Sequence, residues 1–206
     1  MIKFSDLLTS DKLIRSALIH NLKIDHKGEL RTKIVEELGL THGAARVDVA
    51  VVNGILHGYE LKSDLDTLVR LPEQIKIYDS VLDKITLVVG KHHLHSAIKI
   101  IPDWWGVLIA KISKSNGKIV FCNIRKPEDN PLKDSVSIAK LLWREEALDI
   151  LEHLDQANGI RSKRRQVIYE RLSKVLDQKT LRKKVREYLF FRANWRSEKL
   201  HMLSDD

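Results

Sequence analysis

The sequence predicts an α/β protein in which helices flank a mixed β-sheet and a basic helical extension follows at the C-terminus. Three observations predict this class. Apolar residues at helical spacing open the chain, runs rich in β-branched residues fill its middle, and only helical patterns follow residue 131. Of the 206 residues, 43% are hydrophobic, which is enough to bury a core and excludes compositional disorder.

Two helices are predicted first. Residues 12–22 carry apolar side chains three and four positions apart, the spacing of an amphipathic helix. A second, shorter helix is predicted over residues 29–38, where three apolar residues form one stripe and Gly39 ends the helix. Glu37 would border that stripe, whereas Glu36 would point away from it.

A β-hairpin is predicted next, because two runs rich in β-branched residues flank the turn dipeptide Asn53-Gly54. A two-residue turn would send Asp48 and Glu60 to opposite faces of the sheet. We therefore expect a three-residue loop ending at Ile55, or a bulge near Gly58, which pairs Asp48 with Glu60. The apolar face of the hairpin would then carry Val47, Val49, Val51, Tyr59 and Leu61.

The rest of the chain continues the α/β pattern. The stretch from Ser63 to Asp79 predicts a helix that begins at Ser63, with Asp66 as its acidic capping partner. Strands are predicted at residues 86–90, 107–112 and 118–122, and helices at residues 135–154, 162–176 and 180–195.

The polar stretch RKPEDNP at residues 125–131 holds two of the four prolines and predicts a linker. We expect a core in residues 1–125, a linker in 126–134 and a basic helical extension in 135–206.

The positive charge is concentrated near the C-terminus. Lys and Arg number 36 against 28 Asp and Glu, a net charge of +8. Residues 160–199 hold 14 basic and 4 acidic side chains and therefore carry the whole excess. The asymmetry favours a polyanion such as DNA, or an acidic protein, as the partner.

Several classes of protein are excluded by composition. The single cysteine, Cys122, cannot form a disulfide within the chain, and no Cys/His spacing matches a zinc module. No run of 18 apolar residues is present, and the N-terminus lacks the apolar stretch of a signal peptide. We expect a cytoplasmic protein that does not contact a membrane.

Asp48 on the first hairpin strand, with Glu60 and Lys62 on the second, forms the candidate site. Alternate residues of a strand share a face, so Glu60 and Lys62 point the same way. Two converging carboxylates supply the hard oxygen ligands that Mg²⁺ prefers. The metal lowers the pKa of a bound water, and a lysine beside it can position that water and offset charge on a phosphate.

This pattern resembles the signature of the PD-(D/E)XK nuclease superfamily, in which an acidic residue on one strand is followed by Glu-X-Lys on the next. Here the signature reads Asp48, then Glu60-Leu61-Lys62, with Val47 where a proline often precedes the first acid. The resemblance implies a restriction-endonuclease-like fold and a deoxyribonuclease that depends on Mg²⁺ or Mn²⁺.

A second motif points to one branch of that superfamily. The segment QIKIY, residues 74–78, is similar to the Gln-X-X-X-Tyr motif of its exonuclease-type branch. The strings GYELKSDLDTLVRLPEQIKIY and IPDWWG are similar to a small, poorly characterised bacterial and phage family. The resemblance therefore also implies a bacterial or phage-encoded protein.

The resemblance assigns roles to individual residues. Asp48, Glu60 and the Leu61 carbonyl would hold the metal, and Lys62 would orient the attacking water. Glu37, or Glu36 in its place, would assist the metal site from the first core helix.

The residues expected to contact DNA lie on several predicted helices. Gln74, Tyr78 and Arg70 would border the site, since they are four apart on one helix face with Asp66. The basic helices would present a phosphate-facing surface formed by Arg161, Lys163, Arg164, Arg165, Arg182, Lys183, Lys184 and Arg186.

Two alternatives to a nuclease remain at this stage. One is a non-catalytic DNA-binding module of the same fold, and the other is a regulatory protein whose basic helices bind an acidic partner. The sequence leaves open endo- or exonuclease action, DNA or RNA, strand and sequence preference, homo-oligomers or protein partners, and the pathway.

Overall fold

The computed structural model describes residues 8–193 and confirms the α/β class. A six-stranded sheet in the order β1 to β6 forms its centre. The pairs β1–β2, β2–β3 and β5–β6 are antiparallel, whereas β3–β4 and β4–β5 are parallel. The strands are β1 (Lys33–Leu40), β2 (Ala45–Val52), β3 (Leu56–Lys62), β4 (Lys84–Gly90), β5 (Gly106–Ile112) and β6 (Ile119–Arg125).

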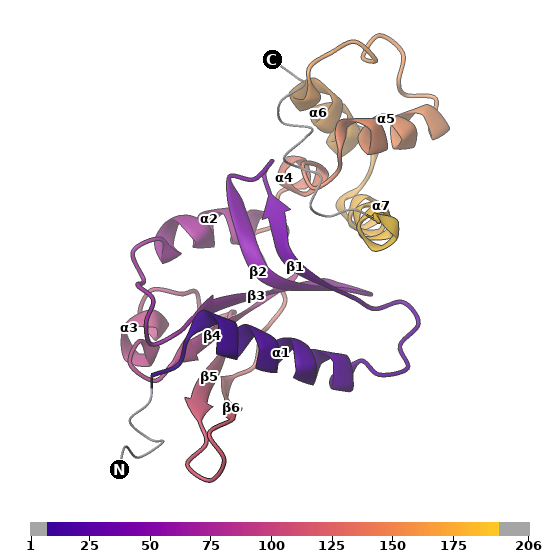
Figure 1. Cartoon of the computed structure of the whole chain (residues 1–206). Helices are drawn as coiled ribbons and strands as arrows, with labels where there is room; N and C mark the ends of the chain where they lie inside the picture. Colours follow the sequence, from indigo (N-terminus) through magenta and orange to yellow (C-terminus); the bar gives the residue numbers. More distant parts are fainter. Residues whose placement is uncertain (1–7, 194–206) are drawn as a thin grey trace.

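Helices cover both faces of the sheet, and four of them gather beyond β1 and β2 (Figure 1). None of the helices in the described part of the chain is long and apolar enough to cross a membrane. The helices are α1 (Asp11–Asp25), α2 (Leu71–Val81), α3 (Leu94–Ile98), α4 (Ser135–Ala139), α5 (Arg144–His153), α6 (Arg165–Val175) and α7 (Gln178–Phe191).

Two hydrophobic clusters lie on opposite faces of the sheet. The smaller one forms where Ile14, Leu18 and Leu22 of α1 pack on β2, β3 and β4. The larger one lies under α2 and also contains buried side chains of α4 to α7, such as Leu181 and Leu189. The C-terminal helices therefore share a core with the sheet.

The helix predicted at residues 29–38 is wrong, because β1 occupies most of that stretch. The β1 strand pairs along its length with β2. This pairing satisfies the backbone N–H and C=O groups that would have bonded to each other within a helix. Leu30, expected in the buried stripe, is 94% exposed. The pairing with β2 therefore prevails over the four-residue spacing of apolar side chains that predicted a helix.

The helix predicted from Ser63 begins only at Leu71, with Pro72 in its first turn. Proline is favoured there because its missing N–H would have had no partner within the helix. Asp66 accepts hydrogen bonds from the Ser63 backbone N–H and hydroxyl at 2.7 and 2.6 Å, so these residues form a turn instead of a cap.

The other predicted elements lie close to the observed ones. The helix expected at 135–154 is divided into α4 and α5, because Trp143 adopts an extended backbone and α5 begins after it. α3 was missed by the sequence analysis, as five-residue helices carry little periodicity. Residues 194 and 195 of the last predicted helix lie outside the described range.

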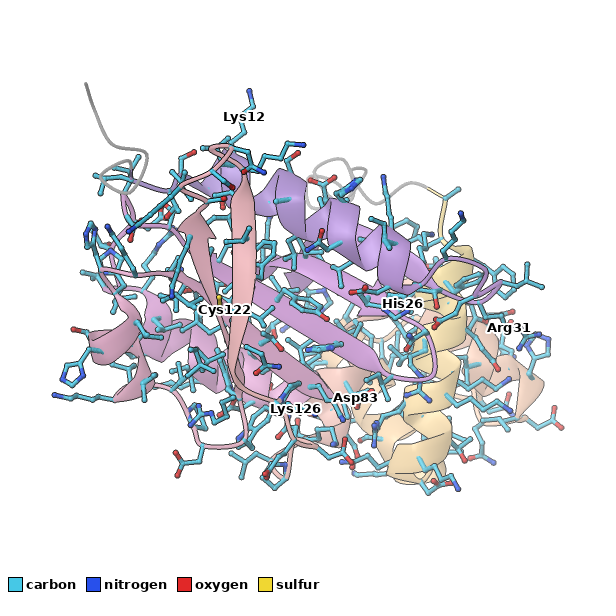
Figure 2. All side chains as sticks on the ribbon, turned by 90° about the horizontal axis from the view of Figure 1, so that it is seen from below. Lys12, His26, Arg31, Asp83, Cys122 and Lys126 are labelled. Carbon is cyan, nitrogen blue, oxygen red and sulfur yellow. The ribbon has the colours of Figure 1, made fainter. Side chains whose placement is uncertain are left out.

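A buried ion cluster joins α7 to the base of the sheet. The Asp83 carboxylate, 3% exposed, binds the guanidinium groups of Arg182 and Arg186 and accepts the Leu56 backbone N–H at 2.8 Å. Asp83 lies beside α7 in Figure 2. This corrects the prediction that Arg182 and Arg186 face phosphate.

Candidate active site

The hairpin has the register that places Asp48 beside the start of the Glu-X-Lys segment. Val52 pairs with Leu56, and Ala50 pairs with Gly58. The loop between the strands therefore has three residues, as predicted. A Cβ on Gly58 would lie 2.6 Å from a methyl group of Leu82, so a larger residue here would displace that side chain.

The alternation of side chains breaks at Asp48 and at Glu37, which lies across from it. Val47 and Ala50 both pack in the larger cluster although they are three residues apart, and so do Val35 and Leu38. Glu37 has a φ of 55°, which turns β1 at this point. The prediction that Val47 shares the face of Val49 is therefore wrong.

Arg15 of α1 binds Asp48 on the side of the sheet that α1 covers. Its guanidinium donates to Asp48 Oδ1 at 2.9 Å and to the Asp48 carbonyl at 2.8 Å. It also lies 2.8 Å from Glu37 Oε1 and 3.0 Å from Asp11 Oδ2. Although burial lowers it, the pKa of Arg15 is raised by Asp11 and Asp48, so the group remains a cation. Glu37 thus reaches the site through Arg15 and lies on a strand, not on the predicted helix.

The second Asp48 oxygen links the two halves of the site. Oδ2 accepts the Leu61 backbone N–H at 2.8 Å, beyond the point where the ladder between β2 and β3 ends at Val49 and Tyr59. Asp48 therefore takes the place of a strand partner and lies beside the residue that follows Glu60.

Glu60 and Lys62 face α2 and are almost completely buried. Lys62 Nζ lies 2.5 Å from Glu60 Oε1 and donates to Gln74 Oε1 at 3.1 Å. Gln74 Nε2 donates to the same Glu60 oxygen at 2.7 Å, and the Tyr78 hydroxyl donates to Glu60 Oε2 at 2.7 Å. The structure thus joins four of the predicted site residues in one hydrogen-bonded network.

The environment of Glu60 favours its protonated form. Burial and the nearby negative charge of Asp48 raise the pKa of Glu60 to about 7, although Lys62 opposes the shift. Burial and Glu60 likewise raise the pKa of the Tyr78 hydroxyl, which stays a donor. The site therefore holds a carboxylate pair whose mutual repulsion a cation would relieve.

The donor set fits Mg²⁺ if backbone and water oxygens complete it. No group of three or more His, Cys, Asp or Glu side chains within residues 8–193 could hold a metal ion. Asp48 and Glu60 supply two carboxylates, and Mg²⁺ in proteins usually binds one or two carboxylates and keeps several waters. The expected Leu61 carbonyl would be the third protein ligand.

The residues predicted to contact DNA fall into separate places. Arg70 is exposed immediately before α2; its carbonyl accepts the Gln74 backbone N–H at 3.1 Å, but its side chain forms no hydrogen bond or ion pair with the site within residues 8–193. Lys183 lines a pocket with Asn53 and Gly54, at the end of β2 away from Asp48. Lys184 is exposed on α7, and Arg164 and Arg165 lie at the start of α6.

Sequence reasoning missed Arg15. The only local signal was Asp11 four residues earlier, a spacing that is common on exposed helix faces. The contact with Asp48 spans 33 residues and depends on how α1 crosses the sheet.

Comparisons with known proteins give one family. The model described as Bacteriophage P4 protein cII matches residues 6–204. Protein cII of Enterobacteria phage P4 is 32% identical over 93 residues, 45% of this chain and 34% of that protein, so the match spans about a third of the relative. A protein of unknown function from Silicibacter pomeroyi has a TM-score of 0.41 and 21% identity over 77% of this chain and 99% of its own.

These matches overturn the assignment to the PD-(D/E)XK superfamily, because the family whose model spans almost all of the chain is a different one. The expectation of a phage-type protein is confirmed. The chain belongs to the bacteriophage P4 protein cII family.

Proposed function

We propose that this protein is a metal-dependent nuclease that hydrolyses phosphodiester bonds of DNA. One observation carries the proposal: Asp48 binds the N–H of Leu61, between Glu60 and its buried ion-pair partner Lys62, where β2 separates from β3, and the charge of Asp48 acts on Glu60. A close carboxylate pair beside a buried cation is costly to maintain for stability alone. The proposal rests on this geometry and on no superfamily assignment.

Each residue of the network has a role in this proposal. Bound Mg²⁺, held by Asp48, Glu60 and the Leu61 carbonyl, would supply a water of lowered pKa and neutralise charge on the phosphate. Lys62 orients that water and stabilises the negative charge that develops in the transition state. Gln74 and Tyr78 hold the Glu60 carboxylate in place from α2.

A second candidate is a DNA-binding module without catalysis. The contact that favours it is the ion pair of Arg15 with Asp48, since a fixed guanidinium already neutralises one of the two carboxylates. Cleavage and binding assays on the same variants separate the two candidates.

The first test compares wild-type protein with the Asp48→Asn variant on plasmid, linear duplex and single-stranded DNA, in Mg²⁺, Mn²⁺ or EDTA. We expect cleavage that requires the metal and falls by at least about 100-fold in the variant. The products would give the mode of cleavage. Asp129→Asn, at an exposed carboxylate, is the control and should cut normally. Binding by all three proteins with no cleavage would favour the non-catalytic module.

Metal binding should depend on pH through Glu60. Because its pKa is raised to about 7, Glu60 holds a proton below that pH, and a cation must displace it. We expect the apparent affinity for Mn²⁺ to fall as the pH drops from 8 to 6, by up to about tenfold per unit below the pKa. Calorimetry in buffers of different ionisation enthalpy would measure the released proton. The Glu60→Gln variant should lose this dependence, and a flat wild-type profile would contradict the assignment.

A further inference from the structure

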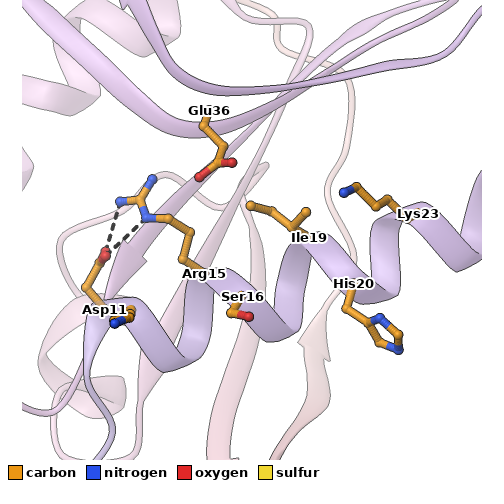
Figure 3. Close-up of a pocket in the computed structure, with 8 residues that line it drawn as sticks. Asp11, Arg15, Ser16, Ile19, His20, Lys23 and Glu36 are labelled. Atoms are coloured by element: carbon orange, nitrogen blue, oxygen red, sulfur yellow. Dashed lines mark hydrogen bonds and ion pairs between the residues drawn. The ribbon is translucent and has the colours of Figure 1, made fainter.

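A groove runs between α1 and β1, directly beside the candidate site. Its volume is about 540 Å³, and Figure 3 shows Glu36 of β1 facing the side chains of α1 across it. The groove is lined by Asp11, Lys12, Arg15, Ser16, Ile19, His20, Lys23 and Glu36.

One face of α1 forms the long wall of this groove. Lys12, Ser16, His20 and Lys23 are exposed and recur at three- and four-residue intervals, so they form a row along the helix. At 1.5 Å per residue the row is about 16 Å long, enough to follow more than one phosphate of a nucleic-acid strand. Lys12 and Lys23 form no ion pair within residues 8–193, so neither charge is offset there.

Arg15 connects this groove to the site. It lines the groove and also binds Asp48, so a ligand that follows the row reaches the guanidinium group that holds Asp48. The basic surface of α7 does not have this continuity. Lys183 lies near Asn53, which follows the end of β2. Asn53 is five residues from Asp48 along the chain, or about 17 Å for an extended strand.

We propose that the α1–β1 groove binds a single strand of DNA and leads it to the candidate site. A polar row with a lysine at each end can follow one sugar–phosphate backbone, and the half-buried Ile19 offers apolar surface to a base. Of the two acidic side chains in the lining, Asp11 pairs with Arg15, whereas Glu36 has no hydrogen-bond or ion-pair partner in residues 8–193 and would limit the affinity. The choice of DNA as ligand rests on the proposed function.

The test measures the anisotropy of a fluorescein-labelled oligo-dT of about ten nucleotides in EDTA, over a series of salt concentrations. Lys12→Ala/Lys23→Ala should weaken binding by about tenfold and reduce the salt slope by about 1.4, or 0.7 for each lost phosphate contact. Glu36→Gln should strengthen binding about two- to threefold, because it removes a charge that repels phosphate.

The matched control is Lys99→Ala/Lys126→Ala, which removes the same charge from two exposed lysines. Lys126 and Lys12 lie on opposite sides of the molecule in Figure 2. The control should change the affinity by less than about twofold. An equal loss in both double variants would mean that only net charge matters and would overturn the proposal.

Two other results would also overturn it. One is a larger loss in Lys183→Ala/Lys184→Ala than in the groove variant, which would place the strand on α7. The other is labelled poly-glutamate binding as tightly as the oligonucleotide with the same dependence on Lys12 and Lys23.

The experiments distinguish a failure of the groove proposal from a failure of the nuclease proposal. Binding in EDTA does not depend on cleavage. If the wild type cuts DNA but the groove variants bind normally, the groove assignment alone fails. If the groove variants lose binding but no form cuts DNA, the nuclease proposal alone fails.

Discussion

Replacing Lys62 by methionine is expected to lower DNA cleavage by at least about 100-fold, because the water loses the cation that orients it. Methionine is close to lysine in length and apolar, so it keeps the packing of a side chain that is 6% exposed. The exchange also leaves Glu60 buried without its ion-pair partner, and the pKa of Glu60 then rises further. At pH 8 we expect a loss of about 3 kcal/mol in the free energy of unfolding.

The double variant Glu60→Gln/Lys62→Met distinguishes an effect on stability from an effect on cleavage. It removes both charges, so most of the lost stability should return while cleavage stays absent. Urea unfolding and a plasmid-nicking assay on the same preparations measure both effects. Lys76→Met, at a side chain that is 70% exposed on α2, is the control and should change neither. Full cleavage by the Lys62→Met variant would contradict the role of Lys62.

Replacing Asp83 by alanine is expected to lower the free energy of unfolding by about 3 kcal/mol, as much as the exchange of Lys62. The change leaves Arg182 and Arg186, 26% and 18% exposed, facing each other without a counter-ion. It also removes the acceptor of the Leu56 N–H. For a chain of this size the melting temperature should fall by about 6–12 °C.

Thermal unfolding followed by circular dichroism measures this change. Asp129→Ala is the matched control, because its carboxylate is 82% exposed and lies 3.6 Å from Lys84. That variant should stay within about 0.5 kcal/mol of the wild type. If both variants lose the same stability, the buried ion cluster does not hold α7 to the sheet.

The candidate site was predictable where its pattern is local. The pairing of the small residues Ala50 and Gly58, opposite the apolar positions of the hairpin, selects a single register. That register brings Asp48 next to Leu61, and the four-residue spacing of Gln74 and Tyr78 places both on one side of α2. Short-range periodicity is enough to predict the hairpin register and the shared helix face, because each is set within one hairpin or one helix.

The partners of the charged residues were not predictable in the same way. Arg15 and Arg186 look alike in sequence, each on an amphipathic helix, yet one binds Asp48 and the other Asp83. The position of a basic residue on a helix surface does not indicate which distant carboxylate it will contact. The basic C-terminal segment therefore indicated a polyanion, while part of that charge stabilises the fold.

The sequence by itself determined the α/β class and the hairpin register, and it predicted Asp48, Glu60 and Lys62 as the candidate group. Only the tertiary structure decided that residues 33–40 form β1, that the strand alternation breaks at Glu37, and that Arg15 reaches the site. The reason is physical: periodicity reflects which face of an element is apolar, a local property. Strand pairing and buried ion pairs depend on hydrogen-bonding and charged groups brought together from distant parts of the chain.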